Sequence, residues 1–135
     1  MSAGDVEAIN SVLSEHVAAV NAGDVSANMS GFAEDVVYLP PDGPPVRGKV
    51  ALESFLRSAV DSFDAQIEMV PEETVVAGEW AFQWGTITGT LRPIGGGDSV
   101  SLDGKWMYVY QRQGDGSWKI ARDVYNSSVP ASSAN

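Results

Sequence analysis

The chain contains no cysteine and only one histidine, His16, so the commonest metal and redox chemistries lack their ligands. The absence of cysteine excludes a disulfide framework and thiolate ligands. A single imidazole cannot assemble the usual zinc-binding sets, and no acidic loop has the spacing of a calcium-binding loop. A glycine-rich phosphate loop and a nucleophilic serine elbow are missing as well. We therefore expect neither a metal ion nor a cofactor.

Basic residues are also scarce, with 8 Lys and Arg against 18 Asp and Glu and a net charge of −10. Such a surface repels a phosphate backbone, so we expect no nucleic-acid partner. The sequence lacks any apolar run near the ~20 residues of a membrane-spanning helix, and its start lacks a basic signal region. Together with the absence of cysteine, these features predict a cytoplasmic protein that does not bind membranes.

The residues that are present suffice for one hydrophobic core. With 135 residues, 44% of them hydrophobic, the chain is expected to form a single domain over residues 1–135. Apolar residues recur at steps of three and four in the first part, which predicts a helix over residues 5–21. A short second helix is expected to begin at the capping residue Asp24 and run to Phe32.

The rest of the first half alternates between strand and helix signals. A short β-rich run at residues 36–39 precedes residues 40–45, which hold four prolines and predict a stiff loop. A third helix is expected over residues 49–61.

The second half predicts four strands separated by glycine-containing turns, at residues 66–77, 79–92, 99–112 and 117–127. Residues 127–135 are expected to be a flexible tail. An α+β fold follows, in which a cone-shaped, curved antiparallel sheet packs against three N-terminal helices and encloses a pocket. Apolar side chains alternate on both faces of the last two strands, so we expect a homodimer through the outer sheet face.

Four segments make the chain resemble the SnoaL-like branch of the nuclear-transport-factor-2-like superfamily, which has a cystatin-like α+β fold. They are NAGD at 21–24, FAEDVV at 32–37, RGK at 47–49 and DGSWKI at 115–120. The resemblance covers residues 5–126. It implies the cone-shaped fold and a ligand pocket, but the superfamily includes isomerases, cyclases, hydrolases, dehydratases and non-catalytic association domains.

The resemblance to ketosteroid isomerases can be followed position by position. The tyrosine that polarises the substrate carbonyl in that family falls on His16, eight residues before Asp24. The catalytic aspartate falls on Pro40, five residues after Asp35, and the protonated aspartic acid falls within residues 107–109, which hold no carboxyl group. Two of the three catalytic groups are thus absent, and the resemblance does not predict ketosteroid isomerase chemistry.

His16 is the candidate catalytic residue. It lies at the edge of the apolar face of the first helix, where an imidazole could bind a ligand carbonyl or transfer a proton near neutral pH. The alternative is a boundary histidine that is hydrogen-bonded to a neighbouring backbone or carboxylate group.

Six further residues are candidate ligand contacts. Period-two alternation from Trp118 and Ile120 directs Arg122 and Asn126 toward the pocket mouth, although Arg122 could instead form an ion pair with Asp103, Glu34 or Asp35. In catalytic relatives a histidine is expected at the position of Val124, which departs from that pattern. The remaining candidates are aromatic and comprise Tyr38, Phe55, Trp84 and Tyr108. Trp84 belongs to a stripe that fits a core or a dimer contact as well as a ligand wall.

Two classes of function remain open. The first is an enzyme of the isomerase, dehydratase, hydrolase or cyclase type that acts on a small, hydrophobic, oxygenated molecule. The second is a ligand-binding or homo-oligomeric association module without catalysis.

Overall fold

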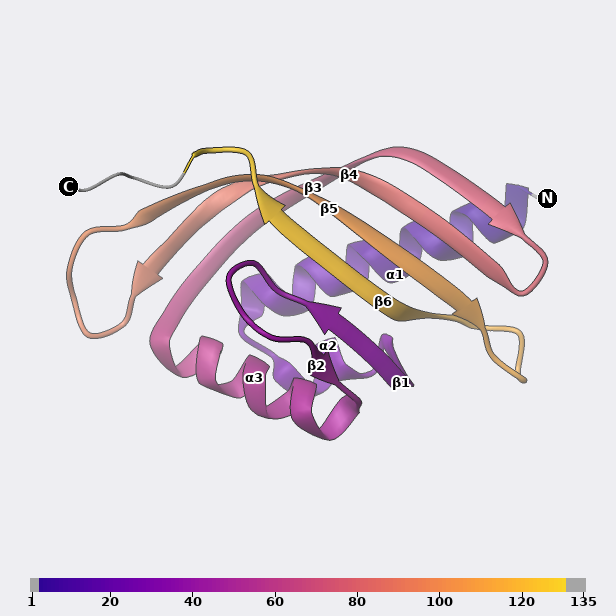
Figure 1. Cartoon of the computed structure of the whole chain (residues 1–135), viewed down its shortest axis with the longest axis horizontal. Coiled ribbons are helices and arrows are strands. Elements are labelled where there is room, and N and C mark those ends of the chain that lie inside the picture. The colour runs from indigo at the N-terminus through magenta and orange to yellow at the C-terminus, as the bar shows by residue number, and fades with distance from the viewer. Residues whose placement is uncertain (1–2, 131–135) are drawn as a thin grey trace.

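The computed structural model describes residues 3–130 and shows one mixed sheet with helices on its inner side (Figure 1). In chain order the elements are α1 (Ala3–Ala22), α2 (Val25–Met29), β1 (Phe32–Leu39), β2 (Val46–Arg47), α3 (Lys49–Ser62), β3 (Phe63–Ala77), β4 (Trp80–Pro93), β5 (Val100–Arg112) and β6 (Trp118–Ser127). No helix between residues 3 and 130 has the length and apolarity that a membrane crossing requires.

The join between α1 and α2 shows how the sequence sets the helix ends. Gly23 adopts a φ of 66°, a left-handed conformation that glycine accepts without strain and that ends α1. Asp24 then caps α2, because its carboxylate accepts a hydrogen bond of 3.0 Å from the backbone N–H of Ala27. The expected second helix is therefore confirmed, but it ends at Met29, and Phe32 already opens β1.

The sheet has six strands in the order β2-β1-β6-β5-β4-β3 and is not closed into a barrel. The four C-terminal strands pair antiparallel, as expected from the short turns between them. β1 instead pairs parallel with β6, so the expectation of an entirely antiparallel sheet is wrong. These two strands are far apart in the sequence, and no tight turn joins them to dictate an antiparallel direction.

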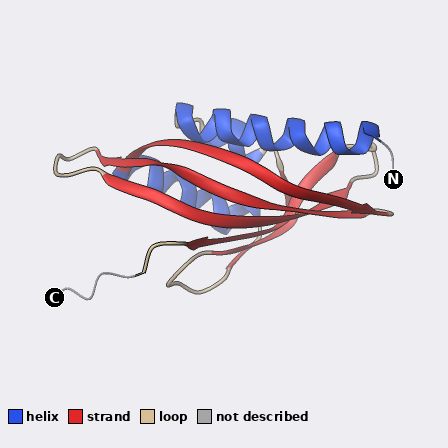
Figure 2. Cartoon of the chain, turned by 90° about the horizontal axis from the view of Figure 1, so that it is seen from above, coloured by secondary structure: helices blue, strands red, loops and turns tan. Residues whose placement is uncertain are grey.

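Glycines on the inner face allow the long strands to bend. A Cβ atom added at Gly85 would collide with the backbone of Val70, and one at Gly104 would collide with the backbone of Asn126. Close approach of this kind marks sites where a sheet curves. Seen from above, the strands curve beneath α1, which runs along the length of the sheet (Figure 2).

The core lies between this concave face and the helices. Its fully buried members come from every layer and include Ile9, Phe32, Leu52, Tyr110 and Ile120. α1 packs mainly on β3, and α3 packs on β1, β2 and β3. The predicted third helix and four long strands are confirmed to within a few residues. The expected tail lies largely outside the described residues, because residues 131–135 are not described.

Candidate active site

A row of polar side chains crosses the inner face of the sheet. Cross-strand pairing places Tyr38 beside Asp123, Asp123 beside Tyr108, Tyr108 beside Gln83, and Gln83 beside Thr74. Directly paired residues on one face of a sheet have Cβ atoms about 4.5–5.5 Å apart. We call these five residues the inner row. They join groups from β1, β6, β5, β4 and β3 into one continuous polar strip.

A β-bulge in β6 sets the direction of the central carboxyl group. Tyr110 pairs with Ile120, but the preceding residue of β5, Val109, pairs with Arg122. Ala121 is therefore an extra residue in β6. An extra residue reverses the alternation of every side chain beyond it. Asp123 consequently points inward, although simple alternation from Ile120 would have pointed it outward.

Asp123 occupies an unusual environment for a carboxyl group. It is 8% exposed, and within the described part of the chain it has no hydrogen-bond or ion-pair partner. Its oxygens are not sealed in the core, since Asp123 lines a pocket. Burial raises the pKa of Asp123 to about 8, because the charged form is poorly solvated there. At neutral pH this group is mostly protonated, yet it is close to losing its proton.

His16 reaches the same site from α1 and is held by two hydrogen bonds. Its Nδ1 lies 2.8 Å from the Asn28 amide oxygen, and its Nε2 lies 2.9 Å from the Tyr108 hydroxyl. Because an amide oxygen only accepts, Nδ1 carries the proton and Nε2 accepts from Tyr108. Burial lowers the pKa of His16 to about 4, an effect that the Asn28 contact offsets only in part. His16 is therefore neutral at physiological pH, and both its nitrogens are occupied.

Tyr38 offers the pocket a free hydroxyl group. Within residues 3–130 its hydroxyl has no hydrogen-bond partner, and the edge of its ring meets Phe55 at a centroid distance of 5.3 Å. Burial first, and then the nearby Asp123 and Tyr125, raise the pKa of Tyr38. Its proton is thus firmly held and can be donated to a ligand oxygen. Phe55 itself is 40% exposed and supports Tyr38 from outside the pocket.

The pocket that these groups share has a volume of about 200 Å³. Its walls are largely apolar and come from Val20, Leu52, Leu56, Ile67, Met69 and Ile87. An apolar cavity of about 150 Å³ accepts benzene, so this pocket has room for roughly one substituted ring. We call it the inner pocket. The predicted residues His16, Tyr38 and Tyr108 all line it.

Four of the six predicted ligand contacts do not line the inner pocket, namely Phe55, Arg122, Asn126 and Trp84. The prediction that Arg122 and Asn126 point to the pocket mouth is wrong, because the bulge at Ala121 reverses the alternation on which it rested. Arg122 donates to the backbone carbonyls of Ala121, at 2.6 Å, and Asp35, at 3.2 Å, rather than to a carboxylate. The Asn126 amide oxygen accepts from the Ser127 N–H at an exposed position.

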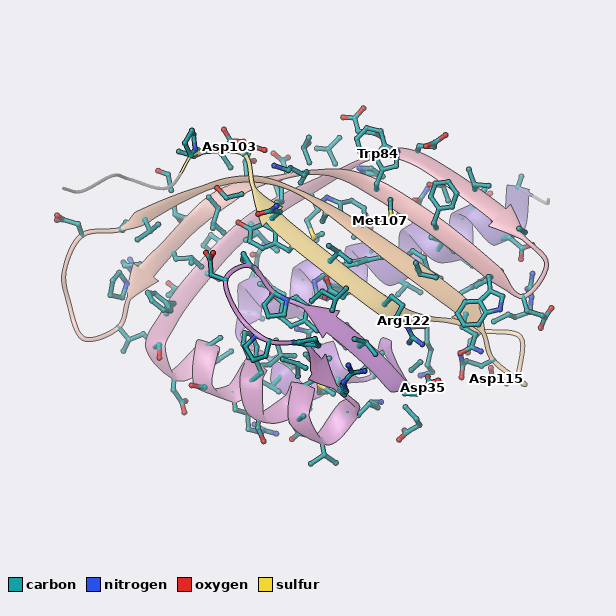
Figure 3. The ribbon with its side chains drawn as sticks, viewed as in Figure 1. Asp35, Trp84, Asp103, Met107, Asp115 and Arg122 are labelled. Carbon is teal, nitrogen blue, oxygen red and sulfur yellow. The ribbon has the colours of Figure 1, made fainter. Side chains whose placement is uncertain are left out.

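Trp84 also lies on the outer face, where it is 38% exposed and its indole N–H donates to Glu73. Figure 3 shows Trp84, Met107 and Arg122 on the side of the sheet that faces the viewer, with α1 behind it. Trp84 belongs to a second cross-strand row, one residue from the inner row, which we call the outer row. Its members are Leu39, Val124, Met107, Trp84 and Glu73. Trp84 therefore does not contact the inner pocket.

Asp123 and Tyr125 are the pocket residues that sequence reasoning missed. Alternation counted forward from Trp118 puts both on the outer face, because no residue type in β6 marks the extra position at Ala121. Alternation counted backward from Tyr125 places Asp123 on the same face as this tyrosine, as the structure has it. Among the described residues, no group of three or more His, Cys, Asp or Glu side chains is arranged to hold a metal ion.

Comparisons with known proteins agree with this architecture. The family model described as the SnoaL-like domain matches residues 13–122. No curated protein matches the sequence.

Three solved structures show the same fold. A ketosteroid isomerase-like protein from Erwinia carotovora atroseptica superposes with a TM-score of 0.88 at 21% identity, covering 96% of this chain and all of that one. A conserved protein from Planctomyces limnophilus gives 0.86 at 24% identity, covering 93% and 99% of the two chains. An NTF2-like protein with a cystatin-like fold from Novosphingobium aromaticivorans gives 0.78 at 17%, covering 97% and 86%.

Proposed function

The chain belongs to the SnoaL-like family of the NTF2-like superfamily, and from this premise we propose that it is an enzyme that transfers a proton on a small, hydrophobic, oxygenated molecule. The observation that carries the proposal is the unpartnered carboxyl group of Asp123, buried in the inner pocket with a pKa near 8. A general acid or base works best when its pKa lies near the working pH.

The proposed step is the removal of a proton from a carbon next to a carbonyl group. The ionised form of Asp123 takes the proton as the C–H bond breaks, and the electron pair moves to the carbonyl oxygen. Tyr38 donates its hydroxyl proton as a hydrogen bond to that oxygen and stabilises the enolate. Return of the proton from Asp123 to the same or another carbon completes an exchange or an isomerisation.

His16 has a positioning part in this proposal. A neutral imidazole with both nitrogens occupied cannot exchange a proton with a ligand while its contacts persist. It fixes the Tyr108 hydroxyl instead, and leaves the lone pairs of the Tyr108 oxygen available to Asp123 or to a ligand. The ketosteroid isomerase pattern expects a carboxyl group within residues 107–109, where this chain has none. Asp123 brings a carboxyl group next to that position, since it pairs directly with Tyr108.

The test is deuterium incorporation into a small aromatic ketone, 1-indanone, in D₂O, followed by proton NMR. We expect the protein to accelerate exchange at the carbon next to the carbonyl, with a rate that rises through an apparent pKa near 8. Asp123→Asn removes the titrating group and should abolish the acceleration, whereas Arg122→Gln, on the outer face, should keep it. An acceleration that survives in Asp123→Asn would refute the proposal, as would no acceleration by the wild type.

A non-catalytic ligand-binding protein is the second candidate. It is favoured by the small volume of the inner pocket, about 200 Å³, which lies below the roughly 300–1,000 Å³ of common ligand sites. Under this alternative 1-indanone shifts the NMR signals of Tyr38 and Tyr108 but does not exchange its protons faster than in buffer.

We also propose that two copies associate through the outer face of the sheet. Four members of the outer row are large apolar residues exposed to solvent, namely Leu39, Val124, Met107 and Trp84. They form one continuous strip across four strands, a pattern typical of a contact surface. A self-complementary strip is what a two-fold dimer requires.

A further inference from the structure

A second, larger cavity lies next to the inner pocket. It has a volume of about 360 Å³ and lies between the C-terminal ends of α1 and α3 and the beginning of β3. Its apolar walls include Ala59, Val60, Phe63 and Ile94. We call it the outer compartment. None of the proton-transfer groups of the inner pocket lines it, so it needs a different explanation.

The two cavities share five lining residues, which are Val20, Asn28, Leu56, Ala65 and Leu91. Each comes from a different element, in the order α1, α2, α3, β3 and β4. Residues contributed from five elements surround the boundary between the cavities, and three of them are flexible aliphatic side chains. Together they form the boundary that an elongated ligand would cross to occupy both cavities.

The charge of the outer compartment restricts what can occupy it. Among residues 3–130, the ionisable residues that line it are Asp24 and Asp64, both acidic. Asp24 caps α2, and Asp64 is paired with Arg92. Both carboxylates therefore already have partners and do not require a cationic group on a ligand. No described Lys or Arg lines the compartment to hold an anionic group, whereas an uncharged hydrocarbon would bury the partly exposed side chains of Phe63 and Ile94.

We infer that the substrate is elongated, with an oxygenated head at Asp123 in the inner pocket and an uncharged apolar tail in the outer compartment. This inference rests on the proposed function for the identity of the head group. It narrows the substrate class from a single ring to a ring that carries an alkyl or similar chain. It also excludes substrates whose tail ends in a carboxylate.

The experiment measures the affinity of a homologous series of 4-n-alkylphenols, from phenol to 4-hexylphenol, by titration calorimetry. Burial of each added methylene should tighten binding roughly fourfold once the chain enters the outer compartment. Ala59→Trp places an indole in that compartment and should remove the dependence on chain length while phenol itself binds as before. Ala51→Trp is the matched control, because Ala51 is an exposed alanine of α3 that lines neither cavity. It should keep the full dependence.

Shifts of the Tyr38 and Tyr108 ring signals locate the phenol head in the inner pocket. Ile94→Ser is a second variant that removes apolar wall without adding bulk, and it should weaken the dependence on chain length. Affinities that do not change with chain length in the wild type would overturn the inference, as would a dependence that Ala59→Trp and Ile94→Ser leave intact. If the alkylphenols behave as expected but the protein does not accelerate proton exchange in the ketone, the inference about the outer compartment is upheld and the proposed catalysis is refuted.

Discussion

Two neighbouring rows of residues across the sheet differ in the opposite sense to most half-exposed sheets. The inner row, which faces the helices, is polar throughout, whereas four of the five residues in the outer row are apolar and exposed to solvent. The rows are built from neighbouring residues of the same five strands. Because stability alone favours the reverse arrangement, both rows are best explained by function. Under our proposals, the pocket-lining members of the inner row contact a ligand and the outer row contacts a second copy of the chain.

The largest expected effect concerns the curvature that makes one face concave. Gly85→Ala should lower the free energy of unfolding by about 3 kcal/mol, because the new methyl group meets the backbone of Val70 and Pro71 across the strand pair. Gly95→Ala is the matched control, since a Cβ atom there has no neighbour within 4 Å. Urea denaturation measures both. Equal stability of the two variants would mean that the sheet does not need its inner glycines.

The second prediction concerns the stability that the protein loses by burying Asp123 in the inner row. The folded-state pKa of Asp123, about 8, lies above that of an unfolded aspartate, so its contribution to stability is full below about pH 4 and is lost as the pH rises toward 8. Asp123→Asn lacks this loss, so its stability relative to the wild type should increase with pH from about pH 4 and level off above about pH 8.

Urea denaturation at a series of pH values measures this difference. His16 titrates in both proteins and cancels in the comparison, because its lowered pKa costs stability only as the pH falls below about 6.5. A difference that stays constant with pH would show that Asp123 ionises normally in the fold.

The third prediction addresses the outer face. Trp84→Asp should weaken self-association at least tenfold, because a carboxylate replaces the largest apolar side chain of the outer row. Thr88→Asp adds the same charge to an exposed residue of β4 outside the outer row and should have little effect. Sedimentation equilibrium measures both dissociation constants. A wild-type protein that is monomeric at high concentration would refute the proposed dimer.

The smallest effect is expected inside the pocket. Tyr108→Phe removes the donor to His16 Nε2 and should cost about 1 kcal/mol of unfolding free energy. Tyr125→Phe is the control, because the Tyr125 hydroxyl has no hydrogen-bond partner within the described residues, and it should be neutral. Thermal denaturation compares the two. Equal melting temperatures would argue against the positioning part of His16.

The sequence predicted the elements well and one side of the site poorly, and the reason is physical. Helix periodicity, capping at Asp24 and glycine turns are local signals, and the elements they predicted were found. The placement of His16, Tyr38 and Tyr108 in one pocket also followed from the family resemblance and from strand alternation. The parallel pairing of β1 with β6 depends on contacts between distant residues, which local patterns do not encode.

Errors in the site arose where alternation was extended across a hidden irregularity. Regular alternation along β6 directs Arg122 and Asn126 inward and Asp123 outward, whereas the extra residue at Ala121 reverses all three. The aromatic stripe that contains Trp84 fits a ligand wall and a contact surface equally well, since it has the same sequence pattern on either face. The pairing of β5 with β6 decides the facing of Arg122 and Asp123, and the pairing of β4 with β5 and β3 decides that of Trp84.

The bulge at Ala121 determines which side chains of β6 beyond it face the pocket. If β6 lost the bulge and Ala121 paired with Val109, Asp123 would turn outward, and Arg122 and Val124 would face the ligand. A change of pairing at one position would thus exchange a weakly acidic pocket for a cationic and apolar one. A scaffold with this property can change its pocket chemistry by gaining or losing a bulge as well as by substitution, which offers a physical route to the chemical diversity found on this fold.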